Sequence, residues 1–390
     1  MSGPLDGLTI VEGGHGIPAA YCTQIMGVLG ANVIKIEPPE GDETRRLGPF
    51  PNDAPDRESS ALFLYLNRNK RSVTLDLDTP SGQDLFRSIV KRADAVVENF
   101  APGYCDQRNI SYAALSDEHD SLVMSSITPF GQNGPYRDWH ATEMTLFAIG
   151  GLMNIVGDIN REPLKFGGSP ALHVAGINSF TATMLAMHLA ETAGIGQHVD
   201  VSVLEGLGAS HFQDLVDYEY HRTVIRRGDM RTPIPTSDGF ISFQVQAHVY
   251  NDFRRLILGP DAADDDRDAA SAIQAQQSGE MDLEILTWSL EKTKLEAYRL
   301  GQEAHVPAAY LADMSDIMAS PQLQAREFFV EIEHPKAGTL TYPGFPAKLT
   351  GSDCRFEPAP LLGQHTHEVI SEFTDLSAAE IGELQAAGVL

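Results

Sequence analysis

Two short segments of the sequence have the residue types that bind anionic groups. Gly13–Gly16, with the sequence Gly-Gly-His-Gly, stands between a β-branched run and a helical pattern, where backbone N–H groups and the helix dipole favour an anion. Asn67–Arg71 places three cations just before another β-branched run. Each segment also has an ordinary interpretation, the first as a tight strand-to-helix turn and the second as a solvated loop. Alone, they indicate no more than an anionic ligand.

Other catalytic patterns are missing from the sequence. It contains no GxGxxG motif, P-loop or GxSxG elbow, which removes the usual signals for dinucleotide binding, nucleoside-triphosphate chemistry and serine hydrolysis. The histidines have no metal-binding spacing, and His365 and His367 are more simply part of a polar loop. We therefore expect no metal site.

The charge and the cysteine content exclude several classes of protein. Lys and Arg number 28 against 54 Asp and Glu, and the net charge of −26 argues against a nucleic-acid or anionic-membrane partner. Cys22, Cys105 and Cys354 are too few and too scattered for a disulfide framework. No signal-peptide pattern is present, and no apolar run approaches the roughly 18 residues of a membrane helix. We expect a cytoplasmic protein that does not span a membrane.

Short β-branched runs alternate with helix-like segments through the first half of the chain, which predicts a parallel α/β sheet. Beyond Gly206 the character of the sequence changes. Residues from about 225 to 330 contain one strand at 240–245, an acidic stretch and helices within 281–302, which indicates a smaller second domain. Strand-like sequence returns from 331, and Ser377–Glu380 offers a capping box for a last helix. We expect the strands of the main sheet at 8–12, 33–37, 72–77, 95–98, 122–127 and 199–203, and its helices from Pro18 to Leu29, from Pro80 to Val90 and over 176–192.

The order of several longer segments is far more specific than any single motif. These segments are Pro4–Gly7, Leu29–Pro38 with Gly41 and Asp42, Leu66–Asp76, Glu98–Gly103, Phe130–Tyr136, Gly194–Ser202, Ser320–Leu323, His334 with Pro335, and Leu362–His365. Together they resemble the class III (CaiB/BaiF-type) CoA-transferase family along nearly the whole chain.

This resemblance implies a fold, a ligand and an assembly. The fold would be a large Rossmann-like α/β domain from residues 1–224 and 331–390, with a small α+β domain at 225–330 inserted, and the dimer would be interlocked. No permanently bound cofactor is implied, because CoA and acyl-CoA are substrates together with a carboxylic acid. Pro38 replaces an arginine of some relatives, which removes one phosphate contact. The positions that match the family's CoA-binding residues are His15, Gly16, Ile17, Pro38, Leu66, Asn69, Lys70, Asn99, Phe100 and Arg108.

The nucleophile of the family is missing at its expected place. Typical members attack the thioester with an aspartate that precedes, by four residues, a glycine opening a long helix; here Gly176 is that glycine and Leu172 stands at the aspartate position. The racemases of the family keep a His-Asp pair where Thr142 and Glu143 stand. The weak substitutes are Glu143, His140 and His173, each with a structural or surface role at least as plausible.

A third departure concerns the glycine-rich loop that covers the active site of some relatives. It would fall at 244–248, where this chain has no glycine, so a lid of that type is doubtful.

Three functions remain open at this stage. The favoured one is the nucleophile-lacking subunit of a heteromeric CoA-transferase, similar to the non-catalytic chain of benzylsuccinate-type transferases, with a homologous partner that supplies the aspartate. The second is a homodimeric acyl-CoA enzyme with altered acid/base chemistry, racemase-like or lyase-like. The third is a CoA-thioester-binding protein without catalysis. The acyl group and the acceptor acid are not indicated by the sequence.

Overall fold

The computed structural model describes residues 2–225, 227, 233–268, 271, 274 and 279–390. The chain divides into two compact units. The larger comprises Met1–Gly157, Glu162–Arg226 and Glu327–Leu390, and the smaller comprises Asp158–Arg161 and Arg227–Arg326. None of the helices in the described part of the chain combines the length and the apolar character needed to cross a bilayer.

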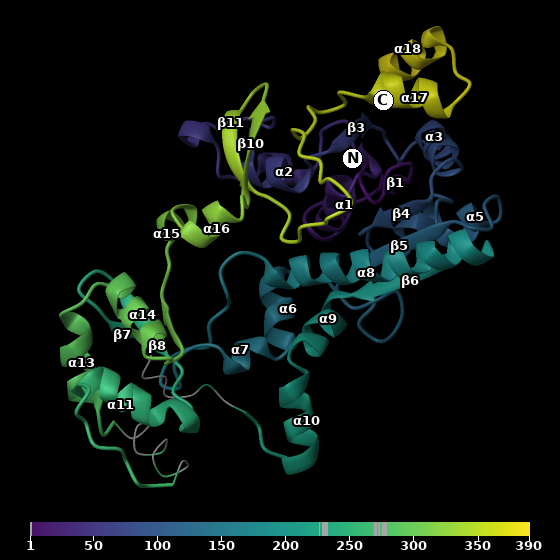
Figure 1. Cartoon of the computed structure of the whole chain (residues 1–390). Helices are drawn as coiled ribbons and strands as arrows, with labels where there is room; N and C mark the ends of the chain where they lie inside the picture. The colour runs from purple at the N-terminus through teal and green to yellow at the C-terminus, as the bar shows by residue number, and fades with distance from the viewer. Residues whose placement is uncertain (1, 226, 228–232, 269–270, 272–273, 275–278) are drawn as a thin grey trace. The chain divides into compact units, whose positions relative to one another are not determined.

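The larger unit is built on a six-stranded sheet whose strands are all parallel (Figure 1). The chain adds strands on one side of β1 and then, from β4 onward, on the other, so the sheet has a topological switch point between β1 and β4. The predicted α/β fold with a Rossmann-like sheet is therefore confirmed. In spatial order the strands are β3 (Lys70–Thr74), β2 (Asn32–Glu37), β1 (Thr9–Glu12), β4 (Ala95–Glu98), β5 (Val123–Thr128) and β6 (Gln197–Ser202).

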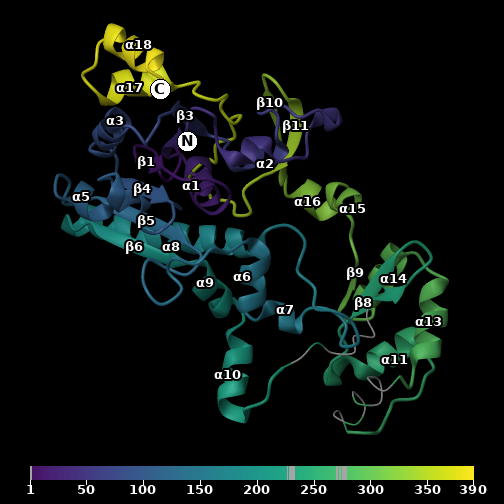
Figure 2. The same ribbon diagram turned by 180° about the vertical axis from the view of Figure 1, so that it is seen from behind.

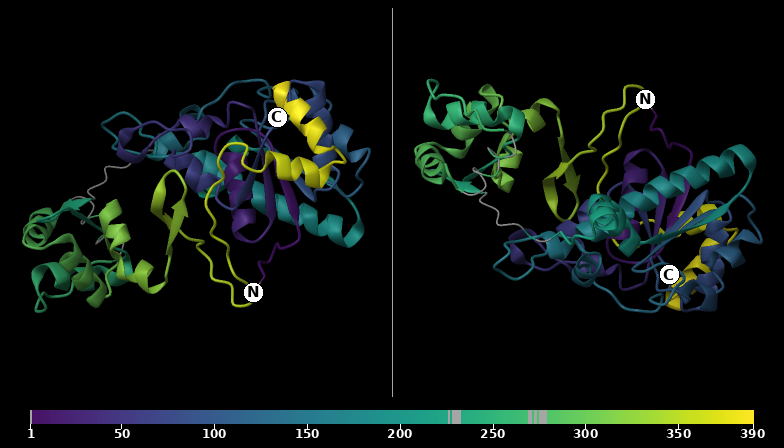
Figure 3. Two further views of the ribbon diagram at one scale, coloured as in Figure 1. Left: turned by 90° about the horizontal axis from the view of Figure 1, so that it is seen from above. Right: turned by 90° about the horizontal axis from the view of Figure 1, so that it is seen from below.

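Helices cover both faces of this sheet, as its doubly buried β-branched strands require (Figures 1 and 2). On one face, α1 (Pro18–Val28) and α8 (Pro170–Ala193) pack over residues such as Val33 and Val97. On the other, α3 (Pro80–Val90), α17 (Thr366–Phe373) and α18 (Ala378–Ala386) share a core with Val11 and Val96. Figure 3 shows α17 and α18 beside α3. The predicted caps Thr79 and Ser377 are both confirmed.

Two predicted boundaries were wrong, and both errors concern candidate site residues. Strand β3 starts at Lys70 and ends at Thr74, because the amide of Asp76 turns away to bond the carbonyl of Val389. Helix α8 starts at Pro170, not at Gly176, with the proline in its first turn. Gly176 instead allows close helix packing: a Cβ there would lie 2.9 Å from the carbonyl oxygen of Pro18 on α1.

The remaining parts of the larger unit surround this sheet. The predicted strands after residue 331 form the antiparallel hairpin of β10 (Phe329–His334) and β11 (Gly338–Pro343), which packs on α2 (Ala61–Leu66). The other elements are the 3-10 turns η1 (Glu43–Arg46) and η2 (Pro51–Asp53) and the helices α4 (Tyr104–Gln107), α5 (Tyr112–Ser116), α6 (Glu143–Ile149), α7 (Leu152–Ile155), α9 (Val203–Ser210) and α10 (Phe212–His221).

The smaller unit has its own core around Ile241, Phe253 and Ile285. Sequence patterns indicated only its middle strand, whereas the structure pairs β8 (Phe240–Phe243) with the short strands β7 (Ile234–Pro235) and β9 (Ala308–Tyr310) in an antiparallel sheet. Strands of two or three residues are too short to show a period. Its other elements are η3 (Ala247–Val249), α11 (Tyr250–Leu258), α13 (Asp282–Leu290), α14 (Lys294–Glu303), α15 (Met314–Met318) and α16 (Pro321–Ala325).

Candidate functional site

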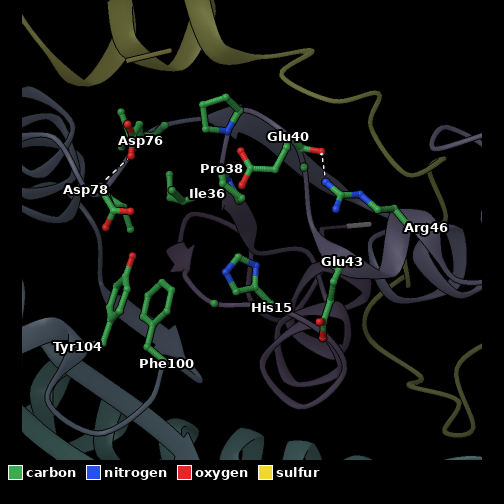
Figure 4. A pocket seen from close by; sticks show the side chains of 15 residues that line it. His15, Ile36, Pro38, Glu40, Glu43, Arg46, Asp76, Asp78, Phe100 and Tyr104 are labelled. Atoms are coloured by element: carbon green, nitrogen blue, oxygen red, sulfur yellow. Dashed lines mark hydrogen bonds between the residues drawn. The ribbon is translucent and has the colours of Figure 1, made fainter. Parts of the chain in front are cut away.

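A cavity of about 580 Å3 lies at the carboxyl ends of β1, β2 and β4. This is the edge at the topological switch point, where open parallel sheets bind their ligands. Of the ten residues predicted to bind CoA, the cavity wall includes His15, Pro38 and Phe100 (Figure 4). His15 and Phe100 are 85 residues apart in the sequence, with Pro38 between them, and the order of the strands in the sheet brings the three together. The wall is completed by Gly14, Ile36, Pro39, Glu40, Gly41, Glu43, Arg46, Leu75, Asp76, Leu77, Asp78 and Tyr104.

Asn99 clamps the glycine turn that forms one wall of the cavity. Its Oδ1 accepts a hydrogen bond from the amide of His15 at 2.9 Å, and its Nδ2 donates to the carbonyl of His15 at 2.6 Å. Gly14 has a φ of +96°, and a Cβ there would lie 2.0 Å from Asn99 Oδ1. Asn99 is thus a positioning residue, and position 14 requires glycine because a Cβ there would collide with Asn99 Oδ1.

Gly16 and Ile17 continue this turn into α1. Gly16 also has a positive φ, of +78°, and a Cβ on it would meet Glu43 at 2.9 Å. Ile17 is the N-cap residue of α1, whose first helical residue is Pro18. Neither lines the cavity, so both contribute by shaping the turn.

Aromatic rings form the opposite wall. Phe100 stacks on Tyr104 with ring centroids 4.3 Å apart, and the guanidinium of Arg108 lies 3.6 Å from the centroid of Tyr104. Arg108 also forms an ion pair with Asp78. Arg108 therefore supports the wall through Tyr104, and a flat π-system such as a nucleobase fits a surface of this kind.

The charges around the cavity are mostly negative, which sequence patterns did not reveal. Glu40, Glu43, Asp76 and Asp78 line it, and Arg46 is the arginine among the lining residues. Arg46 is exposed, donates to the carbonyl of Glu40 at 3.3 Å, and has no salt bridge to any described residue. Its position near Pro38 makes it the cation that could contact a phosphate there. The motif match missed Arg46 because the arginine of some relatives falls on position 38.

The basic run Asn67–Arg71 is used inside the protein. The ammonium of Lys70 is buried and donates to Glu12 at 2.7 Å, to the carbonyl of Ala20 at 2.8 Å and to Asn67 at 3.0 Å. Three acceptors satisfy all of its donors. The prediction that Lys70 holds a phosphate therefore has no geometric support.

Neighbouring residues of the run are also occupied. Arg71 pairs with Glu368 and Glu372 on α17, and Arg68 donates to the carbonyl of Pro343 at 2.7 Å. Asn69 donates a hydrogen bond to the carbonyl of Arg355 and accepts one from the amide of Glu357, and these bonds join the loop before β3 to the segment that precedes α17. Leu66 is fully buried. None of these side chains lines the cavity.

Lys70 belongs to a buried ionic cluster that also contains Lys35, Glu12 and Asp42. Lys35 donates to Glu12 at 2.7 Å and to Asp42 at 2.9 Å. Burial opposes the ionisation of Glu12, but the two ammonium groups outweigh it and lower its pKa to about 2. Burial lowers the pKa of Lys70 to about 8 despite the neighbouring carboxylate of Glu12. The negative charges of Glu12 and Asp42 are thus neutralised by the positive charges of Lys35 and Lys70.

The position expected for the nucleophile, Leu172, lies in the first turn of α8. Leu172 is half-buried and packs against the core between α1 and α8. The carboxylate of Glu143 accepts hydrogen bonds from the amides of Ala171 at 3.0 Å and Leu172 at 3.2 Å. Glu143 therefore caps the helix, where a negative charge is favoured, and this is a structural role.

His173 is held in one tautomer by its surroundings. Its Nδ1 lies 2.7 Å from the carbonyl oxygen of Ser169, which can only accept, so Nδ1 carries a proton. The ring meets Tyr21 edge-on, with centroids 4.7 Å apart. The Nε2 atom of a neutral His173 is then the basic nitrogen. His140, in contrast, is exposed on the loop before α6.

The segment expected to lack a covering loop and the histidine, cysteine and acidic side chains complete the description of the site. The segment at 244–248 follows β8 and enters the 3-10 turn η3, without a glycine. No group of three His, Cys, Asp or Glu side chains has metal-binding geometry within the residues that the structure describes.

Comparisons with known proteins agree with each other. A model of CoA-transferase family III matches residues 5–366. The succinate–glutarate CoA-transferase of Agrobacterium fabrum is 34% identical over 385 residues, which cover 95% of each chain. Subunit BbsE of the succinyl-CoA:(R)-benzylsuccinate CoA-transferase of Thauera aromatica is 29% identical over 388 residues, 95% of this chain and 94% of its own. The crystal structure of a CaiB/BaiF family protein from Brucella suis has a TM-score of 0.85 at 27% identity and covers 96% of this chain and 100% of its own.

Proposed function

This chain belongs to CoA-transferase family III, and we propose that it is the subunit without the nucleophile in a heteromeric CoA-transferase. It binds the CoA part of a thioester in the cavity between His15 and Phe100, and a homologous partner supplies the aspartate that accepts the acyl group. The cavity's position at the switch point of the sheet and its aromatic wall support the binding role.

Leu172 is the observation that carries this proposal. A leucine side chain has no lone pair with which to attack a thioester, and the carboxylate that contacts the first turn of α8, Glu143 of α6, is engaged by two backbone amides. A nucleophile must therefore come from elsewhere if CoA is transferred. The relative BbsE is itself named as a subunit, which supports a partner chain.

Exposed apolar side chains support an extensive contact with that partner. Ile177, Leu185 and Leu189 are 46%, 69% and 36% exposed along one face of α8. On α10, Phe212 is 60% and Tyr220 is 80% exposed. Surfaces of this kind are normally covered in an obligate assembly. The interlocked dimer of the family, formed here with a homologous chain, would cover them.

The substrate class follows from the named relatives. Two of them act on succinyl-CoA or on succinate and glutarate, so we propose a succinyl-type CoA donor and a carboxylic-acid acceptor for this chain. The test is to purify the chain alone and after co-expression with a homologue that has aspartate at the matching position. Both samples are assayed for CoA transfer from succinyl-CoA to a panel of carboxylic acids. Transfer only in the co-expressed sample is expected, and transfer by the chain alone would refute the proposal.

Leu172→Asp provides a second test, with Leu172→Asn as the matched control. The aspartate would lie at a helix N-terminus, which favours its ionised form. We expect the variant alone to form an acyl-enzyme from succinyl-CoA, detected as a mass increase that hydroxylamine removes, whereas the asparagine variant forms none.

The alternative is a homodimeric acyl-CoA enzyme with acid/base chemistry, and the geometry of His173 is the observation that favours it. Because Nδ1 donates its proton to the carbonyl oxygen of Ser169, the other ring nitrogen, Nε2, is available as a base. Exchange of the α-proton of an acyl-CoA with deuterated water, abolished in His173→Phe and retained in His140→Gln, would establish this function instead.

A further inference from the structure

The described part of the chain contains one buried cation without an anionic partner. Its buried lysine and arginine side chains are Lys35, Arg45, Arg68 and Lys70. Three of them each contact a buried glutamate at 2.7 Å. Arg68 is 3% exposed and forms no ion pair with any residue that the structure describes. Because an uncompensated charge is costly away from water, this guanidinium favours an anion from outside the chain.

The guanidinium of Arg68 has a free edge. Its Nη1 donates to the carbonyl oxygen of Pro343 at 2.7 Å, which is its one hydrogen bond to the described residues. The Nε atom is buried and has no hydrogen-bond partner, and Nη2 has none among the described residues either. Nε and Nη2 lie on the same side of the planar group, and such a pair of donors holds a carboxylate through two parallel bonds. The unused donors therefore fit a carboxylate better than a single-point acceptor such as a carbonyl oxygen.

Aromatic side chains surround this guanidinium. Its Cζ atom lies 5.2 Å from the ring centroid of Tyr65 and 5.5 Å from that of Phe356. Burial lowers the pKa of Arg68. Three nearby tyrosines act in the opposite direction, namely Tyr65, Tyr342 and Tyr21. The rings keep water away, which strengthens an ion pair formed here, and the phenolic O–H groups are further donors for an anion.

Tyr21 connects this arginine to the position expected for the nucleophile. It lies on α1, and its ring meets the ring of His173 edge-on, with centroids 4.7 Å apart. His173 follows Leu172 in the first turn of α8. Burial raises the pKa of the Tyr21 hydroxyl, Tyr65 adds to the effect, and Arg68 acts against it. One tyrosine side chain therefore contacts the start of α8 and lies within the electrostatic reach of Arg68.

The cover over Arg68 is an irregular segment. Pro343 is the last residue of β11, and residues 344–365, which include Phe356, form no helix or strand before α17. A loop of this kind opens at a lower free-energy cost than a helix or a strand of the central sheet. A small ligand therefore reaches the guanidinium when this segment moves, although the side chain is buried in the closed arrangement.

We propose that Arg68 binds the free carboxylate of a dicarboxylic substrate, the one that is not joined to CoA. Nε and Nη2 of Arg68 hold its two oxygens, and the other end of the substrate points past Tyr21 toward the first turn of α8. The chain thereby selects a succinyl-type acyl group over a monocarboxylic one of the same length, since a methyl group in place of the carboxylate leaves the guanidinium unpaired. The thioester end of this ligand rests on the proposed function, whereas the carboxylate end does not.

The first experiment compares two unreactive thioethers of CoA, carboxypropyl-CoA and butyl-CoA, which differ only in a carboxylate or a methyl group at the far end. Calorimetry measures the affinity of the purified full chain for both, and the contribution of CoA cancels in their ratio. The wild type is expected to bind carboxypropyl-CoA at least about tenfold more tightly, the usual effect of a charge-assisted contact. Arg68→Gln should bind both with similar affinity. Arg71→Gln, in the same run but paired with α17, is the control and should keep the wild-type ratio.

Arg68→Lys tests the geometry of the site, because it keeps the charge but not the paired donors, and most of the preference should be lost. A second measurement needs no CoA. Succinate should raise the melting temperature of the wild type more than butyrate does at equal ionic strength, and Arg68→Gln should abolish this difference.

Equal affinities of the wild type for the two thioethers would overturn this inference and leave the proposed function intact, because CoA is still bound. Loss of the co-expressed homologous chain from preparations of Arg68→Gln would overturn it as well, since a carboxylate of the partner would then be the anion. A wild type that binds neither thioether but is stabilised by succinate through Arg68 would refute the proposed function instead.

Discussion

Glu143 accepts a hydrogen bond from the backbone amide of Leu172 at 3.2 Å, and this contact joins the two positions at which departures from the family pattern are expected from the sequence. A carboxylate is present beside the nucleophile position, but it serves as the cap of a 24-residue helix. The candidate base Glu143 and the position expected for the nucleophile are therefore parts of one structural arrangement that stabilises the start of α8.

Replacing the capping carboxylate should affect stability. We expect Glu143→Ala to lower the free energy of unfolding by about 1–2 kcal/mol, the usual effect of losing an N-terminal cap. Glu143→Gln, which keeps one acceptor oxygen, should lose less. Urea unfolding followed by circular dichroism measures both. An unchanged stability together with lost transfer activity in the heteromeric assay would show instead that Glu143 takes part in the reaction.

The roles of two cations can be separated by their effects on folding and on binding. Lys70→Met should destabilise the fold by about 3–5 kcal/mol, because it removes one of the two ammonium partners of the buried Glu12 carboxylate and leaves the cluster with an uncompensated negative charge. Arg46→Ala should leave the melting temperature unchanged and weaken CoA binding by about tenfold, the loss of one charge-assisted contact. Lys91→Ala, in an exposed ion pair, is the control for both. If Arg46→Ala binds CoA with the affinity of the wild type, Arg46 does not contact a phosphate group of CoA.

The glycine turn can be tested with two glycines that share a backbone conformation. Gly14 and Gly7 have φ values of +96° and +91°, so an alanine is strained at either position. Only at Gly14 would the new Cβ meet Asn99 Oδ1, at 2.0 Å, whereas nothing lies within 4 Å at Gly7. Gly14→Ala should abolish CoA binding and Gly7→Ala should lose only stability, as calorimetry and thermal melting would show. Equal binding losses would contradict the clamp by Asn99.

The buried carboxyl group of Glu98 should also make global stability depend on pH. Its pKa rises on folding from 4.5 to about 7, so the folded state binds more protons than the unfolded state between these values. The stability associated with this group is present below pH 4.5 and is lost as the pH rises through 7, by about 3 kcal/mol at the limit. Glu98→Gln should remove that loss.

The unfolding free energy of both proteins, measured in urea at pH 5 and pH 8, provides the comparison. The variant should gain on the wild type at pH 8 relative to pH 5. A difference that does not change with pH would mean that Glu98 ionises as it does in the unfolded chain.

The sequence was sufficient for the sheet and for the family. Six β-branched runs predicted the strands of the parallel sheet, and Thr79 and Ser377 predicted helix starts, because strand burial and capping are local properties. The ordered motifs also led to His15, Pro38 and Phe100, which the structure places around one cavity. The same comparison with the family's pattern predicts that Leu172 stands at the aspartate position.

The tertiary structure decided what the charged groups do. Asn67–Arg71 reads as an exposed basic loop, but the partners of Lys70 and Arg71 are Glu12 and residues of α17, far away in the sequence. Glu143 and the amide of Leu172 are separated by 29 residues, and Ser126 meets His198 only because β5 and β6 are neighbours. A side chain's type can be read from the sequence, whereas its ionisation and its partners depend on burial and on contacts that only the folded chain creates.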